Sequence, residues 1–315
     1  MRILQLRKWL SASDDNGGKL RASGLARALS RFAAVDALGF TERGSAELRE
    51  APRLAHYRNL YPVPLPAPAA RATQIALALG RGLSLRSARF CSAEYRERVR
   101  AALATGAYDA VQVEELAMLA NVDPLPAAVP LVYSAHNVES ALTQDLLCAR
   151  GRALSTLGPF DRRREAAEER RALHLARLCL AVSEADRHEL STLAAPLGCP
   201  IHVVPNCADD DITPAPESAS ADEHPRWAVF VACFDWSPNA EAVRWFLGEV
   251  LPCLRRLGPP CAVHFVGSGI SPALARALRA SGCESAADVP DTRPHLARAR
   301  VAMVPLLSGG GTRLK

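Results

Sequence analysis

Short apolar segments alternate with longer amphipathic stretches along the first two thirds of the chain. The apolar segments predict β-strands at residues 2–6, 35–40, 110–114, 131–134, 178–182 and 202–204. The amphipathic stretches predict helices, most clearly at residues 18–31, 72–89 and 160–177. Such alternation is typical of a parallel sheet covered by helices on both faces. Residues 60–69 differ, because prolines at 62, 64, 66 and 68 remove backbone donors and predict a loop.

A polar segment separates this first half from a second one. Residues 209–225 follow Pro205, Asn206 and Cys207 and are rich in Asp, Ser, Pro and Glu. The alternation then resumes, with strands predicted at 228–232, 262–266 and 301–305, helices at 239–257, 272–280 and 293–299, and a turn into Val289. The pattern predicts an α/β protein with domains at 1–207 and 226–315, joined by a linker at 208–225.

The second domain ends abruptly. Residues 309–312 read Gly-Gly-Gly-Thr, which is the pattern of a strand-to-helix turn in which Thr312 caps the next helix. Only residues 313–315 follow, and three residues cannot form a helix. We therefore expect the second domain to be incomplete and the chain to be truncated at its C-terminal end.

The composition is typical of a globular protein without a membrane segment. The chain has 315 residues, 49% of them hydrophobic, which is enough for two cores. Arg2, Arg7 and Lys8 interrupt the N-terminal apolar residues, and no segment approaches about 18 uninterrupted apolar residues. Nine scattered cysteines without a C-x-x-C pair favour a reducing compartment. We expect a cytoplasmic protein, with peripheral contact at the inner membrane face as a further option.

The net charge of +5 gives little support for a nucleic-acid partner. Only three of the 38 basic residues are lysines, and no basic stripe is interleaved with aromatic residues. The arginine-rich run at 162–171 is interleaved with Asp161, Glu165, Glu168 and Glu169. This spacing predicts i,i+4 ion pairs on a solvated helix face, with a membrane-docking patch as the less favoured alternative.

Three segments of the first domain follow predicted strands and carry candidate site residues. In DDNGGK, Gly17 and Gly18 would let the backbone approach a ligand at a helix N-terminus, and a capped flexible turn is the alternative. His136 and Glu139 lie in SAHNVE, just beyond the strand at 131–134, where open parallel sheets bind ligands. A structural histidine is the alternative there. Ser183, in SEAD, is equally well explained as a helix cap.

Two segments of the second domain have a similar position. Residues 233–239 read CFDWSPN and contain Asp235. Asn239 or Ser237 would cap the long helix and leave its positive end open to phosphate, although a cap alone is a sufficient explanation. Gly267 and Gly269, in VGSG at 266–269, give only a weak signal.

The glycine turn near the end of the chain is the third candidate of the second domain. Backbone N–H groups around Gly310 and Gly311 would hold a diphosphate together with Thr312, Arg313 and Lys315. Three consecutive glycines before a capping threonine rarely serve packing alone.

Five segments, taken in order, resemble the family 4 glycosyltransferases of GT-B architecture, particularly a branch associated with bacterial exopolysaccharide assembly. The matching segments are HNVES at 136–140, AVSEAD at 181–186, VVPNC at 203–207, DWSPNAEAVRWFLGEVLP at 235–252 and PLLSGGGTRLK at 305–315. The resemblance covers essentially the whole chain, and the order and spacing of the five segments make it specific.

The resemblance implies two facing Rossmann-like domains, with the donor held mainly by the C-terminal one and the acceptor mainly by the N-terminal one. Gly17 and Gly18 match the loop near the donor phosphates, His136 matches the histidine beside the transferred sugar, and Thr312 with its glycines matches the turn at the diphosphate. It also implies retention of anomeric configuration, with the leaving phosphate helping to deprotonate the acceptor and no classical nucleophile.

The chain departs from the family pattern at two places. The family's Arg and Lys after the first strand of the second domain are absent from 235–239, so Arg313 and Lys315 are expected to meet the phosphate charge. Of its paired glutamates, the first is replaced near Gly310 and the second would lie beyond Lys315, which predicts weak donor binding.

These observations favour a retaining transferase that moves a sugar from a nucleoside diphosphate sugar to a glycan or lipid-linked acceptor. His136 and Glu139 are then the candidate catalytic residues, and neither a metal nor another cofactor is expected. A non-catalytic remnant is one alternative. A GT-B sugar-nucleotide epimerase is another, although no acid/base set for it is identified. Nothing in the sequence indicates the donor sugar, the nucleobase or the acceptor.

Overall fold

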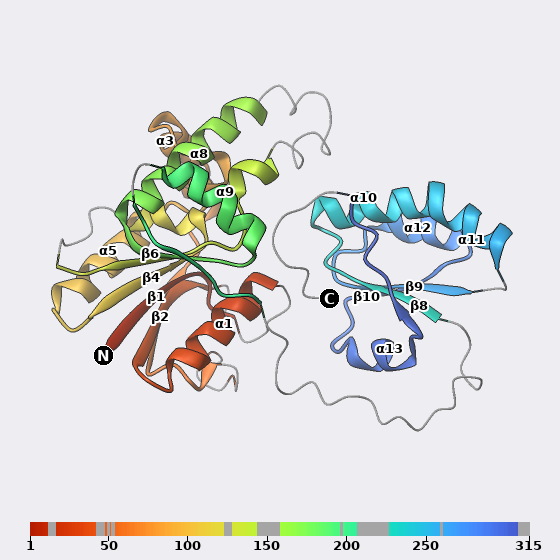
Figure 1. The fold of residues 1–315 in the computed structure, drawn as a ribbon, viewed down its shortest axis with the longest axis horizontal. Coiled ribbons are helices and arrows are strands. Elements are labelled where there is room, and N and C mark those ends of the chain that lie inside the picture. The colour runs from red at the N-terminus through yellow and green to blue at the C-terminus, as the bar shows by residue number, and fades with distance from the viewer. Residues whose placement is uncertain are drawn as a thin grey trace. The chain divides into compact units, whose positions relative to one another are not determined.

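The computed structural model describes residues 1–11, 17–41, 48, 51, 54–122, 128–143, 158–195, 198–206, 227–258 and 261–307. These residues form two compact units, each with its own parallel sheet (Figure 1). Unit 1 contains the described residues up to 206, and unit 2 contains those from 227 onward. The predicted α/β class with two Rossmann-like sheets is confirmed.

Unit 1 is built on seven parallel strands in the order β3-β2-β1-β4-β5-β6-β7. The strands are β1 (Arg2–Trp9), β2 (Ala34–Thr41), β3 (Asn59–Pro64), β4 (Ala110–Glu114), β5 (Leu131–Ser134), β6 (Ala176–Ala181) and β7 (Ile201–Val203). The strand order changes direction between β1 and β4, because β2 lies on one side of β1 and β4 on the other. In open sheets of this kind, ligands bind beside the carboxyl ends of the strands at such a switch point.

Helices cover both faces of this sheet. They are α1 (Gly17–Leu29), α3 (Pro68–Gly80), α4 (Leu85–Phe90), α5 (Ala93–Ala104), the 3-10 helix η2 (Leu116–Asn121), α8 (Gly158–Leu175) and α9 (Glu184–Ala194). Figure 1 shows α1 on one side of the sheet and α8 and α9 on the other. Because both faces are covered, residues on both sides of the central strands are buried, with Leu4, Leu38 and Val111 in one core cluster and Val35 and Ala37 in another.

Two sequence predictions for unit 1 are wrong in detail. The proline-rich segment predicted as a loop contains β3, which is possible because β3 is the edge strand and its missing donors do not interrupt a ladder on its outer side. The single helix predicted at 72–89 is two helices, α3 and α4. The chain turns between them at Gly82, whose φ of +86° suits glycine.

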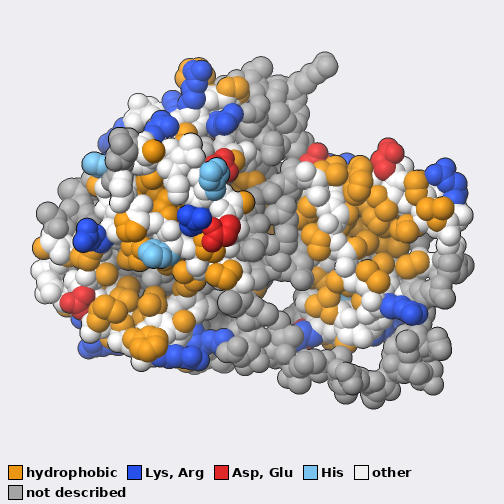
Figure 2. Space-filling model, in the orientation of Figure 1, with side chains coloured by type: hydrophobic (Ala, Val, Ile, Leu, Met, Phe, Trp, Pro, Cys, Tyr) orange, Lys and Arg blue, Asp and Glu red, His pale blue; other side chains and the backbone are white. Residues whose placement is uncertain are grey.

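Unit 2 has four parallel strands in the order β10-β9-β8-β11. Its elements are β8 (Trp227–Val231), α10 (Ser237–Trp245), a π-helical turn (Phe246–Val250), α11 (Leu251–Leu257), β9 (Ala262–Gly267), α12 (Pro272–Ala280), β10 (Glu284–Ala287), α13 (Arg293–Arg298) and β11 (Val301–Ala302). Phe230, Phe234, Phe246 and Phe265 form its core through edge-to-face contacts. Figure 2 shows hydrophobic side chains over much of the visible face of this unit, where α10, α11 and α12 lie.

The sequence predicted β8, β9 and α12 of this unit but not β10. Strand β10 reads ESAA, lacks a large apolar residue and is mostly exposed, so it carries no apolar pattern. Strand β11 has two residues rather than the predicted five. Among the described residues, no helix combines the length and the hydropathy needed to cross a bilayer.

Candidate functional site

The carboxyl ends of β1, β4 and β5 bring charged side chains together at the switch point of unit 1. Strand β1 ends in Lys8 and Trp9, β4 ends in Glu114 followed by Glu115, and His136 follows β5. The parallel register places Glu114 beside Ser134, so the residues after both strands meet at one edge. The sequence predicted His136 here, but it did not single out Lys8, Glu114 or Glu115 as site residues.

His136 is held by a buried carboxylate. His136 Nε2 lies 2.7 Å from Glu114 Oε2, and Gln5 Nε2 donates to Glu114 Oε1 at 3.1 Å. Gln112 also donates to Glu114 Oε1. Burial favours a higher pKa for Glu114, but the hydrogen bond and charge of His136, with smaller contributions from Arg21 and Gln112, lower it below its ordinary value. Glu114 is therefore a fixed negative charge that orients the imidazole.

Glu115 lies on the other side of the same imidazole. Its Oε1 is 3.8 Å from His136 Nδ1, and its Oε2 is 2.6 Å from Lys8 Nζ. Burial acts to raise the pKa of Glu115, but the charges of Lys8, His136 and Arg86 lower it overall. The side chain of Glu115 is 14% exposed, against 2% for Glu114, so Glu115 is the carboxylate that a ligand can reach.

Glu139, the second candidate catalytic residue, is paired inside the protein. Arg86 Nη1, from α4, lies 2.9 Å from Glu139 Oε2 in an ion pair that lacks hydrogen-bond alignment. Arg86 Nε lies 3.4 Å from Glu165 Oε1 on α8. The Glu139 side chain is 3% exposed, and its contact with Arg86 joins α4 to the segment that follows β5. A catalytic role for Glu139 remains a prediction.

The acidic residues of α8 do not form the solvated i,i+4 pairs that the sequence predicted. Glu165, Glu168 and Glu169 are buried, and each binds a segment that leads to the site. Glu168 accepts hydrogen bonds from the backbone and hydroxyl of Ser84 at 2.7 and 2.9 Å, at the start of α4. Glu169 Oε1 accepts the backbone N–H of Glu139 at 2.6 Å. The prediction is wrong because tertiary partners replace the helical ones.

Helix α1 begins at Gly17 and includes Gly18, as expected for the predicted turn; residues 14–16 lie outside the described part. Arg21 Nη1 donates to Val204 O at 2.7 Å and to Asn206 Oδ1 at 3.0 Å. The first turn of α1 is thereby tied to the residues after β7. Ser183 caps α9 by accepting from Asp186 N, so the capping interpretation is confirmed.

In unit 2, four predicted donor-binding residues lie close together where β8 and β9 end. Phe234 N donates to Ser268 O at 2.8 Å, which joins the segment containing Asp235 to the segment between Gly267 and Gly269. Asn239 does not cap α10, because Trp236 holds the cap position and Asn239 Nδ2 donates to Cys233 O at 2.7 Å within the first turn. Ser237 is the first helical residue rather than the cap.

The predicted glycine turn, with Gly310, Gly311, Thr312, Arg313 and Lys315, lies outside the described residues. Its role therefore stays a prediction. No group of three or more His, Cys, Asp or Glu side chains suited to a metal ion occurs in the part of the chain that the structure describes.

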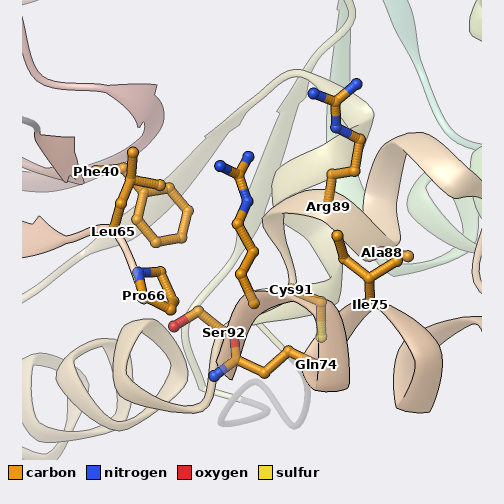
Figure 3. A pocket seen from close by; sticks show the side chains of 10 residues that line it. Phe40, Leu65, Pro66, Gln74, Ile75, Ala88, Arg89, Cys91 and Ser92 are labelled. Carbon is orange, nitrogen blue, oxygen red and sulfur yellow. The ribbon is translucent and has the colours of Figure 1, made fainter. Parts of the chain in front are cut away.

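A shallow depression lies beside the end of β2, between α3 and α4. Figure 3 shows Phe40 and Leu65 on one side of it and Ile75 on the other. Arg71 and Arg89 also line it, and neither guanidinium has a hydrogen bond or ion pair with the described residues. The depression is shallow and encloses no space for a ligand, so it offers these side chains only as a surface contact.

The fold is similar to those of sugar-nucleotide proteins. TarM from S. aureus, in complex with fondaparinux, alpha-GlcNAc-glycerol and UDP, aligns with a TM-score of 0.60 at 7% identity, over 96% of this chain and 80% of TarM. "Trehalose-6-phosphate from E. coli bound with UDP-2-fluoro glucose" aligns with a TM-score of 0.60 at 13% identity, over 98% of this chain and 79% of that one. UDP-GlcNAc 2-epimerase from Methanocaldococcus jannaschii aligns with a TM-score of 0.52 at 11% identity, over 96% of this chain and 78% of the epimerase.

At these identities the similarity concerns the fold, and it confirms the GT-B class. No curated protein matches the sequence. The sequence model of Glycosyltransferase Family 4, however, matches residues 16–212, which is more than half of the chain and includes both α1 and the His136 segment. This protein therefore belongs to Glycosyltransferase Family 4.

Proposed function

We propose that this protein is a retaining glycosyltransferase that moves a sugar from a nucleoside diphosphate sugar to a glycan or lipid-linked glycan in bacterial polysaccharide synthesis. The observation that carries the proposal is the His136–Glu114 pair, 2.7 Å apart, beside the switch point of a family 4 sheet. A buried carboxylate that fixes an imidazole at this edge prepares a polar contact to a sugar.

In the proposed reaction the bond between the anomeric carbon and the phosphate oxygen breaks as the bond to the acceptor oxygen forms on the same face. The leaving phosphate takes the acceptor proton. Glu114 holds the His136 ring against the transferred sugar, so that the ring does not reorganise as charge develops. The turns after β8 and β9, with Asp235 and Gly269, are proposed to approach the donor in unit 2.

The depression beside α3 supports the lipid-linked form of the acceptor. Its apolar lining suits a hydrocarbon group, and Arg71 and Arg89 suit an anionic group next to it. Helix α4 carries both Arg89 and Arg86, and Arg86 pairs with Glu139. Helix α4 thus connects the depression to the buried Glu139 side chain, and peripheral membrane contact is proposed for this side of unit 1.

Binding of UDP-glucose and GDP-mannose, compared with UDP and GDP in titration calorimetry, tests the proposal. We expect one nucleotide sugar to bind, and His136→Ala to weaken it about tenfold, or ~1.4 kcal/mol, by removing a contact to the sugar. The free nucleotide should bind His136→Ala as it binds wild type. The control is His188→Ala, an exposed histidine on α9. Failure of every nucleotide to bind would contradict the proposal and favour a non-catalytic remnant.

An epimerase is the second candidate, because the fold is shared with UDP-GlcNAc 2-epimerase and the structure brings His136, Glu114 and Glu115 together. Those side chains are an acid/base set that the sequence alone did not identify. Inversion by an acid/base set removes a proton from the carbon and returns one, so that hydrogen exchanges with solvent. Deuterium incorporation into UDP-GlcNAc incubated with the protein in D₂O would therefore favour the epimerase over the transferase.

A further inference from the structure

Glu115 has a backbone conformation that normally requires glycine. Its φ is 69° and its ψ is 145°, a region in which a Cβ atom is strained. Asp288 is the only other non-glycine residue with positive φ among the described residues. Since glycine would adopt this conformation at lower cost, the side chain of Glu115 has a use that offsets the strain.

The surrounding structure imposes the conformation. Glu115 N donates to Ser134 O at 3.1 Å, continuing the pairing of β4 with β5, and Met118 N donates to Glu115 O at 3.2 Å as η2 begins. The chain thus changes from strand to helix within one residue. The carboxylate is directed to Lys8 and His136, at the change of strand order.

The contacts around Glu115 favour a sugar over a phosphate. The carboxylates of Glu114 and Glu115 adjoin His136, and the nearby ammonium of Lys8 is already paired. Lys8 Nζ also lies 5.4 Å from the centre of the Phe90 ring, and Phe90 meets the partly buried Trp9 edge-on. A carboxylate accepts hydrogen bonds from hydroxyl groups, and aromatic rings pack against the apolar face of a sugar ring.

We propose that Glu115, next to His136, binds hydroxyl groups of the acceptor sugar, and that the strained backbone is kept because it aims this carboxylate. The inference rests on the proposed function and assigns Glu115 as an acceptor-binding residue of that site. The proposal has two consequences. Glycine should relieve the strain at position 115 relative to alanine, which any side chain in this conformation would show. Loss of the carboxylate should weaken sugar binding, which a purely structural glutamate would not show.

The stability test compares Glu115→Gly with Glu115→Ala, which both remove the carboxylate and differ only in the Cβ atom. We expect the glycine variant to have a folding equilibrium constant about tenfold larger, or ~1.4 kcal/mol, in urea unfolding. The control pair is Glu97→Gly and Glu97→Ala on the exposed side of α5, where alanine should be the more stable. An alanine variant at 115 as stable as the glycine variant would overturn the proposal.

The binding test uses saturation-transfer NMR with methyl glycosides of α-glucose, α-mannose and β-galactose. We expect wild type to saturate at least one glycoside, and Glu115→Ala and Glu115→Gly to bind it about tenfold more weakly. Glu115→Gln keeps one acceptor oxygen, so its affinity should lie between that of wild type and that of the Ala and Gly variants. The affinity of Glu97→Ala should match that of wild type. If wild type saturates none of the three, or if the variants at 115 bind as well, the proposal is overturned.

The two proposals fail in different ways. Nucleotide-sugar binding that responds to His136→Ala, combined with glycoside binding that ignores position 115, would overturn the role of Glu115 alone. Absence of any nucleotide binding would overturn the transferase, whatever the variants at 115 do.

Discussion

Gly267→Ala is expected to destabilise unit 2 by about 3 kcal/mol or more. Gly267 has a φ of +139°, and a Cβ atom there would lie 2.0 Å from Ala232 O. Neither of the two segments can move easily, because Ala232 N donates to Val266 O at 3.0 Å and Asp288 N donates to Gly267 O at 2.9 Å. Tryptophan fluorescence measures the effect, since three of the four tryptophans lie in unit 2.

The matched control is Gly248→Ala in the same unit. A Cβ atom at Gly248 would have no neighbour within 4 Å, and the residue is helical without positive φ. Alanine there should stabilise unit 2 by up to about 1 kcal/mol. Equal urea midpoints for Gly267→Ala and wild type would contradict the steric argument. The close approach to Ala232 by itself explains glycine at 267, so a donor-binding role for Gly267 requires separate support from binding data.

Several element bounds follow from patterns that are visible in the sequence. Strands β4 and β5 have the predicted bounds because both faces of a parallel strand are buried, which makes the strand a short apolar run. Helix α12 has its predicted bounds because Ser271 and Pro272 mark its start, with Ser271 accepting from Leu274 N. Strand β3 escaped prediction because its tolerance of proline depends on its place at the sheet edge.

The site was partly predictable by one rule, namely that polar residues after parallel strands face a ligand. That rule identified His136, and it would equally have identified Glu114 and Glu115 at the end of a predicted strand. What the rule does not supply is which carboxylate is buried and which is exposed. That distinction depends on the contacts of Gln5 and Lys8 from β1, which is more than 100 residues away along the chain.

The glutamates of α8 show a limit of sequence patterns. Glu165, Glu168 and Glu169 stand among arginines and resemble a solvated helix face, yet all three are buried against α4 and the 138–143 segment. Charge spacing along one helix reports only helical neighbours. The partners of these glutamates come from two other segments, so only the tertiary structure identifies them.

Glu169→Gln is expected to remove a loss of stability that wild-type unit 1 undergoes as pH rises. Burial raises the pKa of Glu169 from 4.5 to about 7, although hydrogen bonds from Ser140 and Glu139 oppose the shift. The folded state therefore binds this proton more tightly than the unfolded chain does. The contribution of this proton to the free energy of unfolding is roughly 3 kcal/mol. It is complete below pH 4.5 and is lost as pH rises through about 7.

Other groups of unit 1 titrate as well, so the difference between variant and wild type in the free energy of unfolding is the quantity to measure. Burial raises the pKa of Glu165 to about 8, opposed by Arg86 and Thr143, and burial lowers the pKa of His56 to about 4. His56 acts with the opposite sign, because its stability contribution is lost as pH falls from 6.5 toward 4. Both groups are present in wild type and variant, and their effects largely cancel in the difference.

Urea unfolding between pH 5 and pH 8, in a background that keeps Trp9 as the single tryptophan, gives the free energy of unfolding of unit 1. The glutamine side chain in Glu169→Gln retains an oxygen for the backbone N–H of Glu139 but cannot ionise. Relative to wild type, Glu169→Gln should gain about 2.5 kcal/mol in the free energy of unfolding between these pH values, whereas exposed Glu97→Gln should show a flat difference. An equally flat difference for Glu169→Gln would mean that Glu169 is ionised in the folded protein throughout this range, and that the hydrogen bonds from the 139–140 turn outweigh the effect of burial.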